Sequence, residues 1–165
     1  MMNNHTAVAA LVKQNNKVLL VRNKGDTKRY PSFWTFPSGT LEVGETAYEA
    51  IYREVKEEAG ADVISIDGLA FAGHCISDAE QGLTNFLVFL VSISEKSNLT
   101  PMDPDEEIVE AKFFTFEEAL THLEKIPFDM MREPPIYYLK NNTAGKTPFW
   151  VYRKNAQGLY DVSMY

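Results

Sequence analysis

Cysteine is almost absent from this chain, because Cys75 is the one cysteine among 165 residues. An internal disulfide needs two thiols, and a cysteine-rich zinc site needs more. Both are therefore excluded, and the fold must be held together by its apolar core. Apolar residues make up 45% of the chain and aromatic residues 12%, which is enough for one packed domain of this length.

Positive charge is also scarce, since 16 Lys and Arg residues face 23 Asp and Glu residues and leave a net charge of -7. A protein that binds duplex nucleic acid needs a basic surface, so that class of partner is not expected. A polyphosphate would be repelled as well, unless a bound cation reversed the local charge.

Long apolar runs are missing too. No run approaches the ~20 residues of a membrane span, and residues 1–5 are polar and lack the apolar core of a signal peptide. We therefore expect a soluble cytoplasmic protein without a membrane partner. A monomer and a homodimer both remain open.

Strand-like and helix-like segments alternate along the chain and predict an α/β layered domain. β-rich segments are expected at residues 6–12, 17–22, 33–36, 68–77, 83–94, 111–116, 149–153 and 159–164. Turn residues at 14–16 and 78–82 predict two hairpins. The aromatic-rich residues 141–165 predict a third hairpin, packed on the domain or on a dimer partner. Helices are expected at residues 46–60, 116–125 and 134–140, the last beginning on its prolines, which a first helical turn tolerates.

The first of these helices, expected between a capping Thr46 and a stop at Gly60, carries three carboxylates on one face. Glu54, Glu57 and Glu58 are spaced by three and four residues, so they project together. Neighbouring carboxylates repel one another, and a divalent cation relieves that repulsion. Oxygen ligands without His or Cys favour Mg²⁺, with Mn²⁺ possible, over Zn²⁺. A Glu-rich helix alone is typical of a solvated surface, but the small residues above this face favour a metal site.

The loop before this helix predicts how the site is positioned. Gly39 has no Cβ, so the backbone could approach a phosphate closely and bind the substrate there. Arg53 lies toward the loop side of the helix. An ion pair between Arg53 and Glu45 would tie the loop to the helix and position the ligands.

Residues 39–61 together match the Nudix box, G-x5-E-x7-R-E-U-x-E-E-x-G-U, where U is apolar. The chain therefore resembles the Nudix family over about residues 7–140. The resemblance implies a Nudix-type α/β/α sandwich with a mixed β-sheet. We expect a Nudix hydrolase domain at residues 1–140 and a separate C-terminal extension at residues 141–165.

The resemblance also implies roles for single residues. In the family the usual metal ligands correspond to Glu54 and Glu58, with Glu57 as a frequent third ligand. The residue before the box glycine, here Ser38, often lends its backbone carbonyl. Arg22 lies where relatives often place a basic side chain that contacts phosphate, although a surface arginine at a strand end is equally expected.

The general base varies within the family between a box glutamate and a glutamate in a later loop. The box candidates are Glu54 and Glu57. Among the later candidates Glu106, Glu107 and Glu110, we favour Glu107, whose alternative is a solvated loop carboxylate.

The implied activity is metal-dependent hydrolysis of the diphosphate bond in a nucleoside diphosphate linked to another group, X. A MutT-like nucleoside triphosphate pyrophosphohydrolase is the first candidate, because the chain is compact and lacks the extra N-terminal region common in ADP-ribose hydrolases. A hydrolase of ADP-ribose, a nucleotide sugar or a dinucleoside polyphosphate is the alternative. A non-catalytic nucleotide-sensing Nudix domain is the alternative of another class, although all box carboxylates are present. Isopentenyl diphosphate isomerase shares the fold but needs a cysteine ahead of the box, and Cys75 follows it.

Overall fold

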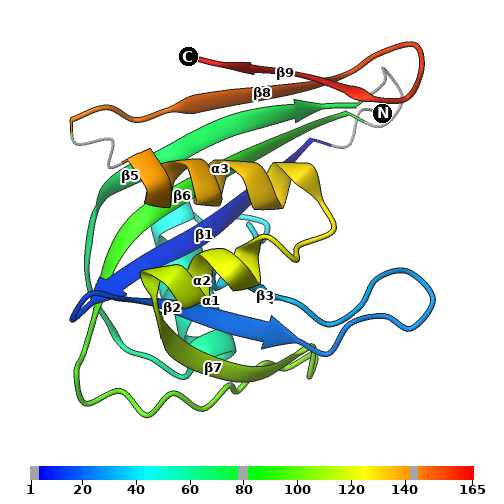
Figure 1. The fold of residues 1–165 in the computed structure, drawn as a ribbon. Helices are drawn as coiled ribbons and strands as arrows, with labels where there is room; N and C mark the ends of the chain where they lie inside the picture. The colour runs from blue at the N-terminus through cyan, green and yellow to red at the C-terminus, as the bar shows by residue number, and fades with distance from the viewer. Residues whose placement is uncertain (1–3, 78–81, 142–144) are drawn as a thin grey trace.

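The computed structural model describes residues 4–77, 82–141 and 145–165. In these ranges the strands form one mixed sheet in the order β3-β2-β1-β6-β5-β8-β9, with β4 paired to β1 and β7 paired to β2 (Figure 1). The β1–β6 and β5–β8 pairs are parallel and the other pairs antiparallel. The strands are β1 (His5–Gln14), β2 (Lys17–Asn23), β3 (Trp34–Thr35), β4 (Ser38–Thr40), β5 (Val63–Ile76), β6 (Leu83–Ile93), β7 (Ile108–Thr115), β8 (Phe149–Lys154) and β9 (Tyr160–Met164).

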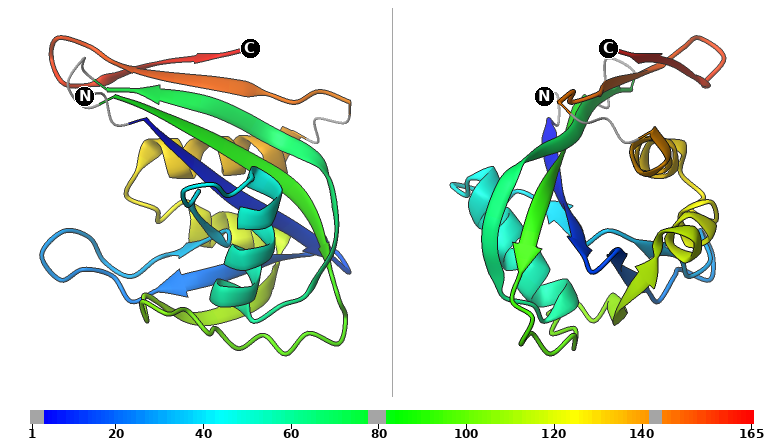
Figure 2. Two further views of the ribbon diagram at one scale, coloured as in Figure 1. Left: turned by 180° about the vertical axis from the view of Figure 1, so that it is seen from behind. Right: turned by 60° about the vertical axis from the view of Figure 1, so that its left-hand side comes forward.

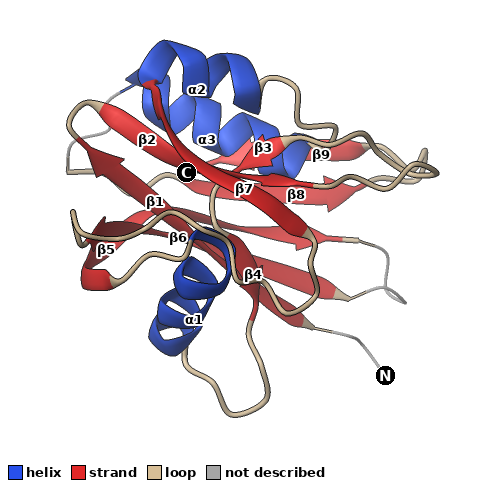
Figure 3. Cartoon of the chain, turned by 90° about the horizontal axis from the view of Figure 1, so that it is seen from below, coloured by secondary structure: helices blue, strands red, loops and turns tan. Residues whose placement is uncertain are grey.

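Helices cover both faces of this sheet. The helix α1 (Ala47–Ala59) lies on one face, and α2 (Phe116–Leu123) and α3 (Asp129–Asn141) lie on the other (Figures 2 and 3). No helix of the described ranges is long and apolar enough to cross a bilayer. The α/β fold with a mixed sheet that the sequence predicts is thus confirmed.

Two buried clusters follow from the period-two alternation of strand side chains. On β1, Val8, Ala10 and Val12 pack in the cluster that contains the apolar side of α1. Their neighbours Ala9 and Leu11 pack in the cluster under α2 and α3. The two faces of β1 therefore pack in different clusters.

The predicted turn between β1 and β2 is confirmed. Asn15 and Asn16 both have positive φ angles, 51° and 58°, which a two-residue hairpin turn of this hand requires. The strands pair only at Lys13–Val18 and Gln14–Lys17. Beyond that point the two strands separate. Strand β1 pairs with β4 and β6, whereas β2 pairs with β7. The predicted turn at residues 78–82 lies largely outside the described residues.

The third helix starts earlier than predicted. It begins at Asp129, and its prolines, Pro134 and Pro135, are buried inside it instead of opening it. The amides of Met131 and Arg132 both donate to the carbonyl of Phe128 at 3.0 Å, so the first turn forms ahead of the prolines. Packing of both rings in the core compensates for the hydrogen bonds that proline cannot donate. In addition, β5 begins five residues before its predicted start, and β4 forms in the segment that was expected to be a loop before α1.

The C-terminal residues extend the sheet. Strand β8 pairs in parallel with β5, and β9 forms an antiparallel hairpin with β8 at the outer edge. Trp150 and Tyr152 of β8 are buried beside Cys75 and contact Phe86 of β6. The side chains of β9 are exposed. The division of the chain into a domain at residues 1–140 and an extension at residues 141–165 stays a prediction. The choice between a monomer and a homodimer stays open.

Candidate active site

The helix α1 has both ends fixed by local hydrogen bonds. The hydroxyl of Thr46 accepts from the amide of Glu49, and the carboxylate of Glu49 accepts from the amide of Thr46 at 2.8 Å, which is a capping box. At the other end Gly60 adopts a φ of 68°, and its amide donates to the carbonyl of Lys56. Both predicted ends are confirmed, so the rotational setting of the three carboxylates is fixed as well.

Arg53 lies at the centre of an ion-pair network at the loop side of α1. Its Nε and Nη2 atoms donate to the two carboxylate oxygens of Glu45, each at 2.8 Å. Nη2 also donates to the carbonyl of Thr40 at 3.2 Å. The hydrogen bonds from Arg53 lower the pKa of Glu45 to about 2. Loop and helix are therefore joined by a bidentate, charge-assisted contact.

The three carboxylates of the helix lie in different surroundings. Glu54 is buried and accepts from Arg53 Nη1 at 2.6 Å, while Glu57 is 3.4 Å from the same atom. Glu58 turns the other way, and its Oε2 accepts from the amide of Ser38 at 2.7 Å.

Burial raises the pKa values of two of these groups. It raises the pKa of Glu54 despite the opposing effect of Arg53. It raises the pKa of Glu58 to about 9, although the hydrogen bond from Ser38 opposes it. Arg53 partly offsets the effect of burial at Glu54, whereas no basic side chain among the described residues forms an ion pair with Glu58.

Gly39 lies directly against the carboxyl group of Glu54 on α1. A Cβ atom at this position would overlap the carboxyl group of Glu54. The space beside Gly39, where we expected a phosphate to approach the backbone, is thus filled by the side chain of Glu54. Substrate contact at Gly39 stays a prediction for its backbone.

The donor groups fit a hard divalent cation chemically, because Glu54, Glu57 and Glu58 offer only oxygen. In the described part of the chain, however, no three His, Cys, Asp or Glu side chains converge closely enough to hold one ion. Arg53 draws Glu54 and Glu57 toward the loop, and the amide of Ser38 draws Glu58 toward β4. Coordination of one cation would therefore need rotation of these side chains. Ser38 contacts Glu58 through its N–H, whereas the family resemblance implied that its carbonyl would bind the metal.

Arg22 and Glu107 lie outside this network. Arg22 donates to Glu110 Oε2 through Nε at 3.1 Å and Nη2 at 2.9 Å, and its guanidinium lies 5.8 Å from the ring centre of Trp34. Glu107 is exposed and 3.8 Å from Lys24. Within the described residues neither side chain has a hydrogen bond or ion pair with the α1 carboxylates.

Asp103 is a nearby carboxylate that the sequence reasoning missed. Repulsion from Asp103 helps to raise the pKa of Glu58. Its loop is attached to α1, because the amide of Met102 donates to the carbonyl of Glu57 at 2.7 Å. Asp103 also accepts from the amides of Glu107 and Ile108 at 2.7 and 2.9 Å. The acidic loop was visible in the sequence, but the hydrogen bonds that single out Asp103 were not.

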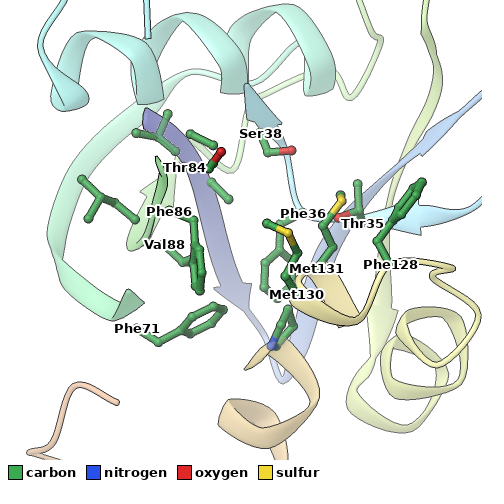
Figure 4. A pocket seen from close by; sticks show the side chains of 15 residues that line it. Thr35, Phe36, Ser38, Phe71, Thr84, Phe86, Val88, Phe128, Met130 and Met131 are labelled. Atoms are coloured by element: carbon green, nitrogen blue, oxygen red, sulfur yellow. The ribbon is translucent and has the colours of Figure 1, made fainter. Parts of the chain in front are cut away.

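A cavity of about 410 Å³ opens next to Ser38, between the sheet and α3 (Figure 4). Phe36, Phe86 and Val88 line it from the strands, and Met130 and Met131 line it from α3. Ser38 lies at the end near α1, and Phe71 lies at the end away from it. Since the amide of Ser38 contacts Glu58, this residue connects the carboxylate cluster with the cavity.

Comparison with known proteins shows the family of this chain. Residues 3–133 match the family model of the NUDIX domain. The chain is 30% identical over 135 residues to an ADP-ribose pyrophosphatase of Methanocaldococcus jannaschii, covering 76% of this chain and 69% of that protein. It is 33% identical over 84 residues to an 8-oxo-dGTP diphosphatase of Proteus vulgaris, covering 51% of this chain and 74% of that protein.

Solved structures show the same fold. A Nudix hydrolase from Nitrosomonas europaea aligns with a TM-score of 0.71 at 24% identity, over 92% of this chain and 78% of that one. A MutT protein from Bacillus halodurans aligns with a TM-score of 0.65 at 18% identity, over 97% of both chains. The chain belongs to the Nudix family, and its class is that of the Nudix hydrolases.

Proposed function

We propose that the chain is a Mg²⁺-dependent pyrophosphohydrolase, with Mn²⁺ as a possible substitute. The observation that carries this proposal is the cluster of Glu54, Glu57 and Glu58, two of whose pKa values are raised by burial. A bound divalent cation would neutralise these carboxylates, polarise the phosphoryl oxygens and lower the pKa of the attacking water. The candidate ligands are Glu54, Glu57 and Glu58, with the carbonyl of Ser38 as a fourth.

The remaining residues of the network position these ligands. Arg53 joins Glu45 to Glu54 and Glu57, so it fixes both the loop and two carboxylates. Arg22 is the candidate phosphate contact from β2, and release from Glu110 would make its guanidinium available.

Nucleoside diphosphates linked to X are the substrates that we propose to test first. The names of the two relatives point to ADP-ribose and to 8-oxo-dGTP. The second of these substrates is a nucleoside triphosphate, which agrees with the MutT-like hydrolase favoured from the sequence. Nucleotide sugars and dinucleoside polyphosphates are the further alternatives. The cytoplasmic location stays a prediction.

A turnover screen with Mg²⁺ and with Mn²⁺ tests the proposal. It covers canonical and oxidised nucleoside triphosphates, ADP-ribose, nucleotide sugars and dinucleoside polyphosphates, with products identified by mass and Glu58→Gln as the blank. Reaction in ¹⁸O-labelled water shows which phosphorus is attacked. Metal-dependent cleavage that the blank lacks supports the hydrolase. Binding of a nucleotide without any turnover would instead favour the non-catalytic sensor.

Glu107 is the proposed general base from the later loop. Its backbone is fixed by Asp103 and Lys24, whereas its side chain is exposed and can turn. We expect Glu107→Gln to lower kcat by about tenfold. This is less than the usual ~10²–10⁴ for a general base, because Glu106 in the same loop can partly replace it. The acidic limb of the pH–rate profile should change as well.

The matched control for this variant is Glu95→Gln, an exposed glutamate in another loop. It should leave both kcat and the pH–rate profile unchanged. If Glu107→Gln behaves like this control, the base is not Glu107, and one of the box glutamates Glu54 and Glu57 becomes the candidate.

A further inference from the structure

The cavity beside Ser38 is almost without hydrogen-bonding side chains. Fifteen described residues line it, and the polar ones among them are Thr35, Ser38 and Thr84, each with one hydroxyl group. None of these fifteen residues has a charged or an amide side chain. Figure 4 shows instead aromatic rings and two thioethers around the space.

This lining is poorly suited to recognising a nucleobase. The edge of a base carries several donors and acceptors, and each one buried without a partner costs ~1–3 kcal/mol. A hydroxyl group donates and accepts through a single oxygen atom, so it cannot form the paired, side-by-side contacts by which amide and guanidinium groups distinguish bases. An apolar group placed here gains ~0.8 kcal/mol for each buried CH₂ and leaves no polar atom unpaired.

A second cavity, whose lining includes the side chain of Asp129 as well as apolar groups, adjoins the first. It has a volume of about 300 Å³, shares Phe128 and Met130 with the first cavity and reaches Cys75 and Tyr152 under β8. Methionine side chains are flexible and adapt to irregular apolar groups. The shared wall at Met130 therefore leaves room for a group that is longer than a base.

We propose that this cavity binds the hydrocarbon group of an isoprenoid or long-chain alkyl diphosphate, whose diphosphate then lies at the carboxylates of α1. The proposal rests on the proposed diphosphate hydrolysis and adds a substrate class that the nucleotide candidates do not include. Ser38 sets the geometry, since its side chain lines the cavity and its amide lies 2.7 Å from Glu58.

The reaction balances without a further reactant. Water forms a bond to the terminal phosphorus, and the bond from that phosphorus to the bridging oxygen breaks. The products are inorganic phosphate and the alkyl monophosphate, which share the two protons of the water. The carbon–oxygen bond to the hydrocarbon stays intact, so no group inside the cavity has to react.

Kinetics on diphosphates of different chain length test this inference. We expect kcat/KM for farnesyl diphosphate to exceed that for dimethylallyl diphosphate, and that for any nucleoside triphosphate or ADP-ribose, by about tenfold or more. Ala9→Phe fills the cavity from β1 and should raise KM for farnesyl diphosphate about tenfold. A Tm and a circular-dichroism spectrum close to those of the wild type show that the variant is folded, so the rise in KM reports on the filled cavity. Ile64→Phe, on an exposed position of β5, is the matched control.

A binding measurement separates this inference from the proposed hydrolysis. The probe is the farnesyl ester of methylenediphosphonate, whose P–C–P bridge cannot be hydrolysed, titrated calorimetrically with Mg²⁺ present. Binding to the wild type and to Ile64→Phe, but about tenfold weaker to Ala9→Phe, supports the apolar site even if no substrate is turned over. Cleavage of nucleotides together with no binding of this probe would overturn the inference and leave the hydrolase intact. Equal binding to Ala9→Phe would overturn it too.

Discussion

Glu58→Gln is expected to lower kcat/KM by about 10⁴-fold, the largest effect of any single substitution in this chain. The estimate follows from the several kcal/mol that a coordinated metal contributes in the transition state, at ~1.4 kcal/mol for each tenfold. An amide keeps the size of the side chain and can still accept from the Ser38 amide, so the fold should persist. The measurement is steady-state turnover of the best substrate from the screen, with Glu95→Gln as the control.

The same variant should change the pH dependence of stability in the absence of metal. The folded state raises the pKa of Glu58 from its ordinary 4.5 to about 9. Protonated Glu58 therefore makes its full contribution to the free energy of unfolding below pH 4.5. This contribution is lost as the pH rises toward 9. In the presence of a chelator, the Tm of the wild type should fall between pH 4.5 and 9, and the Tm of Glu58→Gln should fall less. Added Mg²⁺ should raise the wild-type Tm and not that of the variant.

Two results would contradict the assignment of Glu58. Nearly full activity of Glu58→Gln would remove it from the metal ligands. A wild-type Tm that responds to Mg²⁺ no more than that of the variant would place the cation elsewhere, even if the activity were lost.

Arg53→Ala is expected to lower kcat by about 10²-fold, because it releases two carboxylates and the loop at once. Misplacement of catalytic groups by ~1 Å already costs a factor of this size. Glu45→Gln should produce part of the same loss, since it weakens the bidentate contact at 2.8 Å from the other side. KM should change less than kcat, because Arg53 acts on the ligands and not on the substrate.

A double-mutant cycle is the control for this positioning role. If Arg53 and Glu45 act as one unit, the double variant should lose little more activity than Arg53→Ala alone. Arg53→Lys should not restore the wild-type rate, because an ammonium group cannot make both contacts to Glu45. Unchanged kinetics of Arg53→Ala would refute the role, and fully additive losses would show that the two residues act independently.

Local sequence signals predicted the helix α1 well. The capping box, the glycine stop and the spacing of the three glutamates are all contained within a few residues of the chain, so they can be read directly. The mixed α/β fold followed from the family motif. For α3, however, the prolines gave a misleading local signal, because core packing outweighed their cost inside the helix.

The unpredicted parts of the site depend on contacts between distant residues. Arg22 pairs with Glu110, 88 positions away, and the Ser38 amide meets Glu58 across 20 positions. The close contact of Gly39 with Glu54 on α1 likewise joins two separate elements. Sequence spacing within one motif carries no information on such partners, which is also why the cavity under α3 became visible only in the structure.

The two larger buried clusters lie on different faces of the sheet. One lies under α1, which carries the proposed metal ligands, and the other lies under α2 and α3, beside the proposed substrate cavity. The apolar side of α1 is anchored in the first cluster. Of the fifteen residues that line the cavity, six belong to the second cluster and two belong to the first, Val8 and Leu87. The two clusters have no described residue in common. Substitutions around Met131 and Phe71 can therefore reshape the cavity while the setting of Glu54 and Glu58 is preserved, and their stability effects should add independently. A sheet with a different core on each face lets new substrate ranges evolve at one face without loss of the hydrolytic machinery at the other.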